Sequence, residues 1–161
     1  MQAESNVVEF PVKEKKEVRL SLVPSQDIHK YWDLVVPGLE EALSKSGGEF
    51  TADTLLAGLQ AGVSWLWIGL SGTEYGGVMI TEVIQTDTRK WINIPFAYSV
   101  PSSDRSSSDL SLTFDALKQI EVFAKSMGFS GIKFLSARKG FERLAPKAGY
   151  TPRFVEYVKE F

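Results

Sequence analysis

The sequence contains no cysteine and only one histidine, His29. The absence of cysteine excludes disulfides, thiolate catalysis and cysteine-bound metal, and it is typical of proteins from a reducing compartment. One isolated histidine argues against a multi-histidine zinc site and against a hydrolase built on a Ser-His-Asp triad. We therefore predict that the protein has no metal site.

Long apolar runs and a strong net charge are also absent. The longest apolar stretches, such as residues 65–70, are far shorter than the ~20 residues that a membrane-spanning helix needs. The first residues show neither the basic start nor the apolar core of a secretory signal. The 18 basic and 20 acidic side chains give a net charge of −2, which provides no strong attraction for nucleic acid or anionic lipid. We expect a cytoplasmic protein with no nucleic-acid and no membrane partner.

The composition that remains is that of an ordinary globular protein. The chain has 161 residues, 43% of them hydrophobic and 24% charged, which fits one domain with a sizeable core. Residues 1–16 carry no sustained apolar period. We predict that they form a flexible tail and that 17–161 is a single domain.

The first two thirds of that domain predict one strand, two helices and a run of three strands. Residues 17–23 alternate as a half-buried strand does, and helical spacing follows from residue 26, with Pro37 and Gly38 expected to kink or split the helix. Thr51 is a good N-cap for the second helix and Gly62 a good left-handed end. Strands at 64–70, 77–84 and 91–100, joined by short polar turns, predict an antiparallel meander.

The last third alternates helices and strands. After a polar loop at 101–109 we expect a helix whose apolar face consists of Phe114, Leu117, Ile120, Ala124 and Met127. The strand at 131–136 follows that helix, so it should lie parallel to the preceding strand. A helix at 139–147 and a terminal strand at 151–161 complete the pattern. The predicted fold class is α/β (α+β), with a mixed, mostly antiparallel sheet and about four flanking helices.

This order of elements resembles that of the GNAT superfamily, which transfers acyl groups from coenzyme A to amines. The resemblance covers residues 17–161 and is strongest at 138–150, where a short helix closes on Gly149 and Tyr150. Residues 28–32 and 65–67 also resemble small GNAT-like proteins of tailed bacteriophages. The resemblance implies an N-acetyltransferase that uses acetyl-CoA.

In the family, a loop of the form Arg/Gln-x-x-Gly-x-Gly/Ala binds the pyrophosphate through backbone N–H groups and a helix N-terminus. The matching stretch here is 105–110, in which Ser108 replaces the first glycine and Asp109 places a carboxylate against the phosphates. The alternative is a mobile surface loop. The cofactor-binding residues that the resemblance implies are Arg105, Ser106, Ser107 and Ser108, with Tyr98 and Val100 on the strand that pairs with pantetheine. We expect acetyl-CoA to bind weakly or not at all.

The catalytic positions of the family are altered as well. Its general acid, a Tyr four residues before the closing glycine, is replaced by Ala145, and its Asn by Arg138. Glu82 is the one acid inside a central strand pattern, and partial burial beside Val78 and Ile80 would make it a stronger base. The alternative is that Glu82 is solvated at an exposed strand end.

Two functions follow from this pattern. The first is an acetyl-CoA-dependent N-acyltransferase in the cytoplasm. The second is a non-catalytic GNAT-like phage protein that binds a host or virion protein, located in the host cytoplasm or the virion. The missing glycines, the missing tyrosine and the charge of Asp109 favour the second.

Overall fold

A computed structural model describes residues 17–101, 111–136 and 139–161. The predicted tail at 1–16 lies outside the described residues, as do most of the predicted loop, 102–110, and residues 137–138. The elements, in chain order, are β1 (Val18–Val23), the 3-10 turn η1 (Ser25–Asp27), α1 (Ile28–Ser44), α2 (Ala52–Gln60), β2 (Ser64–Ser71), β3 (Glu74–Gln85), β4 (Lys90–Ser99), α3 (Ser111–Ser126), β5 (Gly131–Phe134), α4 (Lys139–Leu144) and the 3-10 turn η2 (Pro146–Ala148).

The strands form one sheet in the order β1-β2-β3-β4-β5. The first four strands are antiparallel neighbours, and β5 lies parallel to β4, as the sequence predicted. The crossover from β4 to β5 runs through α3, which is the usual way to connect parallel neighbours. The predicted mixed, mostly antiparallel sheet with four helices is confirmed.

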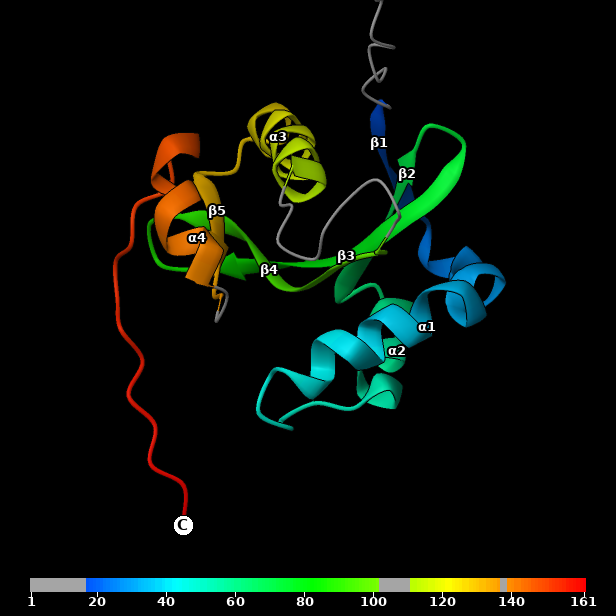
Figure 1. The fold of residues 1–161 in the computed structure, drawn as a ribbon, viewed down its shortest axis with the longest axis horizontal. Coiled ribbons are helices and arrows are strands. Elements are labelled where there is room, and N and C mark those ends of the chain that lie inside the picture. The colour runs from blue at the N-terminus through cyan, green and yellow to red at the C-terminus, as the bar shows by residue number, and fades with distance from the viewer. Residues whose placement is uncertain (1–16, 102–110, 137–138) are drawn as a thin grey trace, which may run out of the picture.

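Helices cover both faces of the sheet (Figure 1). α1 and α2 lie together on one face and α3 crosses the other, while α4 lies beside β5. Each face has its own apolar core. The core under α1 and α2 includes Val35, Leu39, Leu66, Ile80 and Phe96. The core under α3 includes Trp67, Met79, Ile92, Leu117 and Ile120.

Local signals placed the ends of α2 correctly. Thr51 caps the helix by accepting a hydrogen bond from the backbone N–H of Thr54 at 3.3 Å. Gly62 follows the helix with φ of 71°, the left-handed conformation that a glycine adopts without a steric cost. Both features depend on nearby residues alone, which is why the sequence was sufficient to predict them.

The sequence predicted a kink or a split at Pro37 and Gly38, and the helix is not split. α1 is continuous, with Pro37 inside it. Its neighbours Val35 and Leu39 are fully buried, and the ring of Tyr98 lies directly against Gly38. Packing against the sheet offsets the hydrogen bond that a proline removes from a helix.

Two further predictions are wrong for tertiary reasons. Met127 is 57% exposed rather than buried with the rest of the α3 face, because α3 ends at Ser126 and the helical spacing no longer places Met127 against the sheet. Residues 151–161 form no strand, and every residue among them is exposed. Figure 1 shows this segment leaving the body of the molecule beyond α4. Alternating apolar residues do not make a strand unless a neighbouring backbone completes the ladder.

Candidate functional site

The strands β4 and β5 are paired only over the first half of β4. The parallel register joins Trp91 to Gly131 and ends where Ile94 meets Phe134. β4 then continues to Ser99 in contact with β3, while β5 ends. Among the described residues, no strand therefore pairs with the outer edge of β4 from Pro95 to Ser99.

A β-bulge marks the point where β4 parts from β5. In the β3–β4 register, Ile80 pairs with Phe96 but Glu82 pairs with Asn93, so β4 has one extra residue between these pairs. Pro95 lies in this interval, where a missing backbone N–H is tolerated.

The bulge reverses which face the side chains of β4 point to. Before it, Ile92 and Ile94 pack in the core under α3. After it, Phe96 and Tyr98 pack in the core under α1 and α2. A regular strand would have placed all four on one face.

The open half of β4 presents unpaired backbone groups. Val100 donates its N–H to the carbonyl of Gly76 at 2.9 Å, so the backbone of Val100 faces β3. Along an antiparallel pair, the backbone N–H and C=O groups of successive residues point alternately toward the partner strand and away from it. Those of Tyr98 therefore also point to β3, whereas those of Ala97 and Ser99 point outward. The outward N–H and C=O groups of Ala97 and Ser99 can hydrogen-bond to an extended ligand that contains amides.

Glu82 lies on the inner strand next to the bulge. Its side chain is half-buried, and its Oε1 accepts a hydrogen bond from Asn93 Nδ2 at 2.8 Å. β3 keeps a regular register with β2 here, so Glu82 shares the face of Val78 and Ile80, as the sequence analysis supposed. The carboxylate is therefore oriented by a neutral amide and keeps a second oxygen available, an arrangement suited to a general base.

A group of cations lies next to this pair on the same face of the sheet. Lys133 of β5 is the register partner of Asn93, and its Nζ is 4.5 Å from the centroid of the Trp91 ring. The guanidinium carbons of Arg89 and Arg153 lie 5.5 Å and 5.9 Å from the same centroid. We call Trp91 and these three cations the Trp91 cluster.

The Trp91 cluster depends on a close approach of the two strands. A Cβ atom at position 131 would lie 2.7 Å from the ring of Trp91, so only glycine leaves room for the indole. Within the described parts of the chain, no carboxylate forms an ion pair with Arg89, Lys133 or Arg153. Over those residues the cluster therefore presents a positive field beside Glu82 and Asn93.

Of the residues that the sequence grouped as a cofactor site, the structure describes only Tyr98 and Val100. The ring of Tyr98 lies against Gly38 of α1, and the N–H of Val100 is bonded to β3. Arg105, Ser106, Ser107 and Ser108 lie outside the described residues.

Sequence reasoning missed the Trp91 cluster. Arg89, two residues before Trp91, was a visible signal, but the position of Lys133 depends on strand pairing and that of Arg153 on the tertiary fold.

The position of the family's general acid carries no hydroxyl. Ala145 lies one residue after α4, and its N–H is bonded to the carbonyl of Phe141. The neighbouring Tyr150 packs its ring 5.1 Å from that of Phe134 and donates its hydroxyl to Glu121 on α3 at 2.9 Å. Burial, together with this bond to Glu121, raises the pKa of Tyr150 well above its usual value. Tyr150 thus connects α3 to the segment that follows η2.

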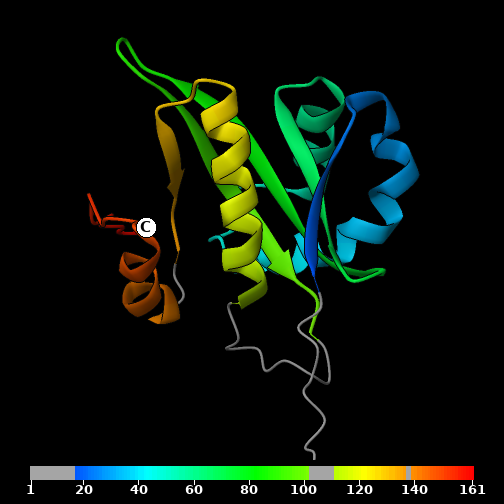
Figure 2. The same ribbon diagram turned by 90° about the horizontal axis from the view of Figure 1, so that it is seen from above.

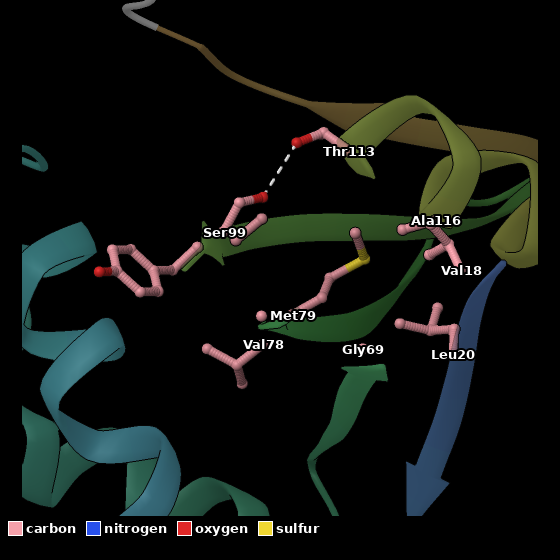
Figure 3. A pocket seen from close by; sticks show the side chains of 11 residues that line it. Val18, Leu20, Gly69, Val78, Met79, Ser99, Thr113 and Ala116 are labelled. Carbon is pink, nitrogen blue, oxygen red and sulfur yellow. Dashed lines mark hydrogen bonds between the residues drawn. The ribbon is translucent and has the colours of Figure 1, made fainter. Parts of the chain in front are cut away.

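A small cavity lies on the α3 side of the open half of β4 (Figure 3). Its volume of ≈ 30 Å³ holds no more than a few water molecules. Ser99 and Thr113, whose hydroxyl oxygens are 3.3 Å apart, join the end of β4 to the first turn of α3 at its rim. The cavity is too small for an acyl chain, so the outer edge of β4 is the better candidate for ligand binding.

Two absences hold for the described residues. No three His, Asp or Glu side chains of that part of the chain are grouped as metal ligands would be. Over the same residues, no helix is both long enough and apolar enough to cross a membrane.

The fold is shared with solved acetyltransferases. The chain is similar to a ribosomal-protein-alanine N-acetyltransferase from Brucella melitensis biovar Abortus 2308, with a TM-score of 0.63 and 13% identity over 90% of this chain and 99% of that chain. It is also similar to a predicted acetyltransferase from Clostridium acetobutylicum solved with acetyl-CoA, with a TM-score of 0.62 and 16% identity over 88% of this chain and 96% of that chain.

An aminoglycoside acetyltransferase from an uncultured soil metagenomic sample, in complex with sisomicin, gives a TM-score of 0.59 and 12% identity over 89% of this chain and 93% of that chain. No protein-family model matches the sequence, and no curated protein does. The structural likeness establishes the fold: the chain has the fold of the GNAT acetyltransferases.

Proposed function

We propose that the chain is an acetyl-CoA-dependent N-acyltransferase whose acyl donor lies along the open edge of β4. The observation that carries the proposal is the parting of β4 from β5 at the bulge, with the Glu82–Asn93 pair next to it. Support also comes from the solved neighbours, which are acetyltransferases, one of them with acetyl-CoA.

The described residues fit the amide-bearing arm of coenzyme A. The outward backbone groups of Ala97 and Ser99 match an extended chain of alternating amide donors and acceptors. The first turn of α3, held to β4 through Ser99 and Thr113, brings a helix N-terminus to the same end of the strand. That terminus favours an anion, whereas Asp109 opposes one. These opposing contributions support weak binding.

In this proposal, acetyl-CoA supplies the acetyl group as a thioester. Glu82 accepts the proton of the attacking amine, either directly or through one water molecule, as the new C–N bond forms and the C–S bond breaks. Asn93 holds the carboxylate in place through its amide. Ala145 has no proton to give, so solvent protonates the departing thiolate, and we expect slow turnover.

The Trp91 cluster supports an acceptor that carries a negative charge. Three cations beside the proposed base repel an ammonium ion and attract a carboxylate or phosphate group. Lys133 is the register partner of Asn93, whose amide holds the proposed base. The acceptor that fits is an amine with an acidic group within one or two residues of it.

A non-catalytic binding protein is the second candidate. Ala145 in place of the acid and Asp109 in the loop favour it, because both weaken the chemistry and leave the fold intact. In that case the partner is a host or virion protein. The phage origin, and a location in the host cytoplasm or the virion, stay predictions.

Calorimetry with acetyl-CoA on an Ala97→Pro variant tests the proposal. Proline removes an outward N–H without removing a β3–β4 hydrogen bond, so the sheet should survive while binding weakens. Ala97→Gly, which keeps the N–H, is the matched control and should bind as the native protein does. Equal binding by the native and Ala97→Pro proteins would contradict the placement of the donor. No heat and no thermal shift with the native protein would favour the non-catalytic function.

A further inference from the structure

A row of four polar side chains crosses the sheet from β2 to β5. Ser64 of β2 is the register partner of Glu82, and Glu82 is that of Asn93. Lys133 of β5 is in turn the register partner of Asn93. Side chains of register partners point to the same face of a sheet, and all four are half-buried. We call these four residues the polar row.

The polar row lies where the apolar core under α1 and α2 ends. One step along the strands, Leu66, Ile80 and Phe96 are buried in that core. Phe50, in the loop between α1 and α2, packs its ring 5.8 Å from the ring of Phe96 and is 46% exposed. The polar row is therefore the first part of this face that a ligand can reach.

Charged groups are separated along the polar row. Glu82 places a carboxylate on β3, and Lys133 places a cation on β5, where the Trp91 cluster adds two more. Neighbouring strands lie about 4.8 Å apart, so these two positions, two strands from each other, are roughly 10 Å apart. A complementary ligand has a positive and a negative group at that separation.

Asn93 lies between the two charges and offers a hydrogen-bond acceptor. Because a carboxylate only accepts hydrogen bonds, the amide nitrogen of Asn93 faces Glu82 and its amide oxygen points elsewhere. Among the residues that the structure describes, this oxygen has no hydrogen-bond partner. It can accept the N–H of a peptide bond that crosses the row.

We infer that the acceptor is the amino terminus of a peptide or protein whose third residue is acidic, bound across the polar row; this inference rests on the function proposed above. The α-amine lies at Glu82, the first peptide bonds pass over Asn93, and the acidic side chain reaches Lys133. An extended chain advances about 3.4 Å per residue, so two residues and an acidic side chain span the roughly 10 Å between the charges.

Two other kinds of amine match the polar row less well. In a free amino acid a single carbon joins the amine to the carboxylate and holds them within about 4 Å of each other, too close to reach both ends of the row. A polycationic amine such as an aminoglycoside has no negative group for Lys133, and the Trp91 cluster repels it.

Calorimetry without acetyl-CoA tests the recognition separately from the chemistry. The probes are amidated hexapeptides that are identical except for Glu, Gln or Lys at the third residue. The Glu peptide should bind about fivefold more tightly than the Gln peptide, and the Lys peptide should bind most weakly. A peptide with its only Glu at the fifth residue should bind as the Gln peptide does, and free glutamate should give no measurable heat.

A charge reversal in the protein tests the role of Lys133. Lys133→Glu should invert the order of the Glu and Lys peptides, and Lys133→Gln should remove the preference. Circular dichroism should show the native fold in both variants, and the comparison of peptides on the native chain remains decisive if either fails to fold. Lys118→Glu makes the same charge change at an exposed position of α3, on the opposite face, and is the matched control that should keep the native order.

Kinetics separates this inference from the proposed function. In acetyl transfer the preference should appear in KM and leave kcat unchanged, because the third residue is remote from the reacting amine. Equal binding of the three peptides would overturn the inference, and acetyl transfer to all three at one rate would then leave the proposed function intact. The expected order of binding without any acetyl transfer would support the recognition and contradict the proposed function.

Discussion

The two halves of β4 differ in what surrounds them, although they belong to one strand. The half from Trp91 to Ile94 has strands on both sides and contributes Ile92 and Ile94 to the core under α3. The half from Pro95 to Ser99 has β3 on one side only. The bulge between them lies where β4 changes from a strand paired on both sides to a strand with one free edge, and such an edge can hydrogen-bond to a ligand.

The largest effect is expected where the two halves meet. Glu82→Gln keeps an oxygen for the Asn93 hydrogen bond but removes the proposed base, so under the proposed function acetyl transfer should fall by about 10²–10⁴-fold. Release of coenzyme A, followed with a thiol reagent, measures it. Asp53→Asn, which changes an exposed acid on α2, is the control and should retain the native rate. An undiminished rate in Glu82→Gln would remove Glu82 from the mechanism.

The half of β4 from Trp91 to Ile94, which is paired on both sides, is tested through α3, the helix that packs on it. Leu117 is 3% exposed in the core with Ile92 and Ile94, so Leu117→Ala should lower the free energy of unfolding by about 2–5 kcal/mol. Met127→Ala, just beyond the same helix, should change it by no more than about 0.5 kcal/mol. Urea denaturation measures both. Similar losses in the two variants would mean that burial does not distinguish these positions.

The open half is tested through the loop that follows it. If phosphates bind near the start of α3, Asp109→Ala should tighten acetyl-CoA binding and Arg105→Ala should loosen it, each by ~1 kcal/mol or more. The two changes must have opposite signs, because the side chains bear opposite charges toward one anion. Calorimetry decides this, and binding that responds to neither change would show that the phosphates lie elsewhere.

The smallest effect is expected at Tyr75, which packs in the core with Tyr98 on the α1 side of the open half. Its hydroxyl is buried and has no hydrogen-bond partner among the described residues, and burial raises its pKa to about 12. Stability from the buried neutral phenol is complete below the unfolded pKa of about 10 and is lost as the pH rises toward 12.

Tyr75→Phe should leave the free energy of unfolding at pH 7 unchanged or slightly higher and should remove that alkaline loss. Denaturant titrations between pH 8 and about 12 measure both effects. Tyr157→Phe, which changes an exposed phenol, is the control and should keep the native profile. A clear loss of stability in Tyr75→Phe at neutral pH would show that the hydroxyl has a partner.

The sequence by itself determined the features that depend on neighbouring residues. Helical spacing gave the buried face of α3 through Leu117 and Ile120, and Thr51 and Gly62 fixed the ends of α2. The order of elements was sufficient to predict the mixed sheet and the parallel β5, because a crossover through a helix leaves few alternatives.

Only the tertiary structure decided where the candidate site lies. The bulge at Pro95, the bond from Asn93 to Glu82 and the position of Lys133 beside Trp91 all depend on register between strands. Register is set by pairing partners distant in sequence, and a shift of one residue moves every side chain to the other face. For the same reason the strand that the sequence predicted at 151–161 is not formed, since an apolar pattern becomes a strand only when another backbone meets it.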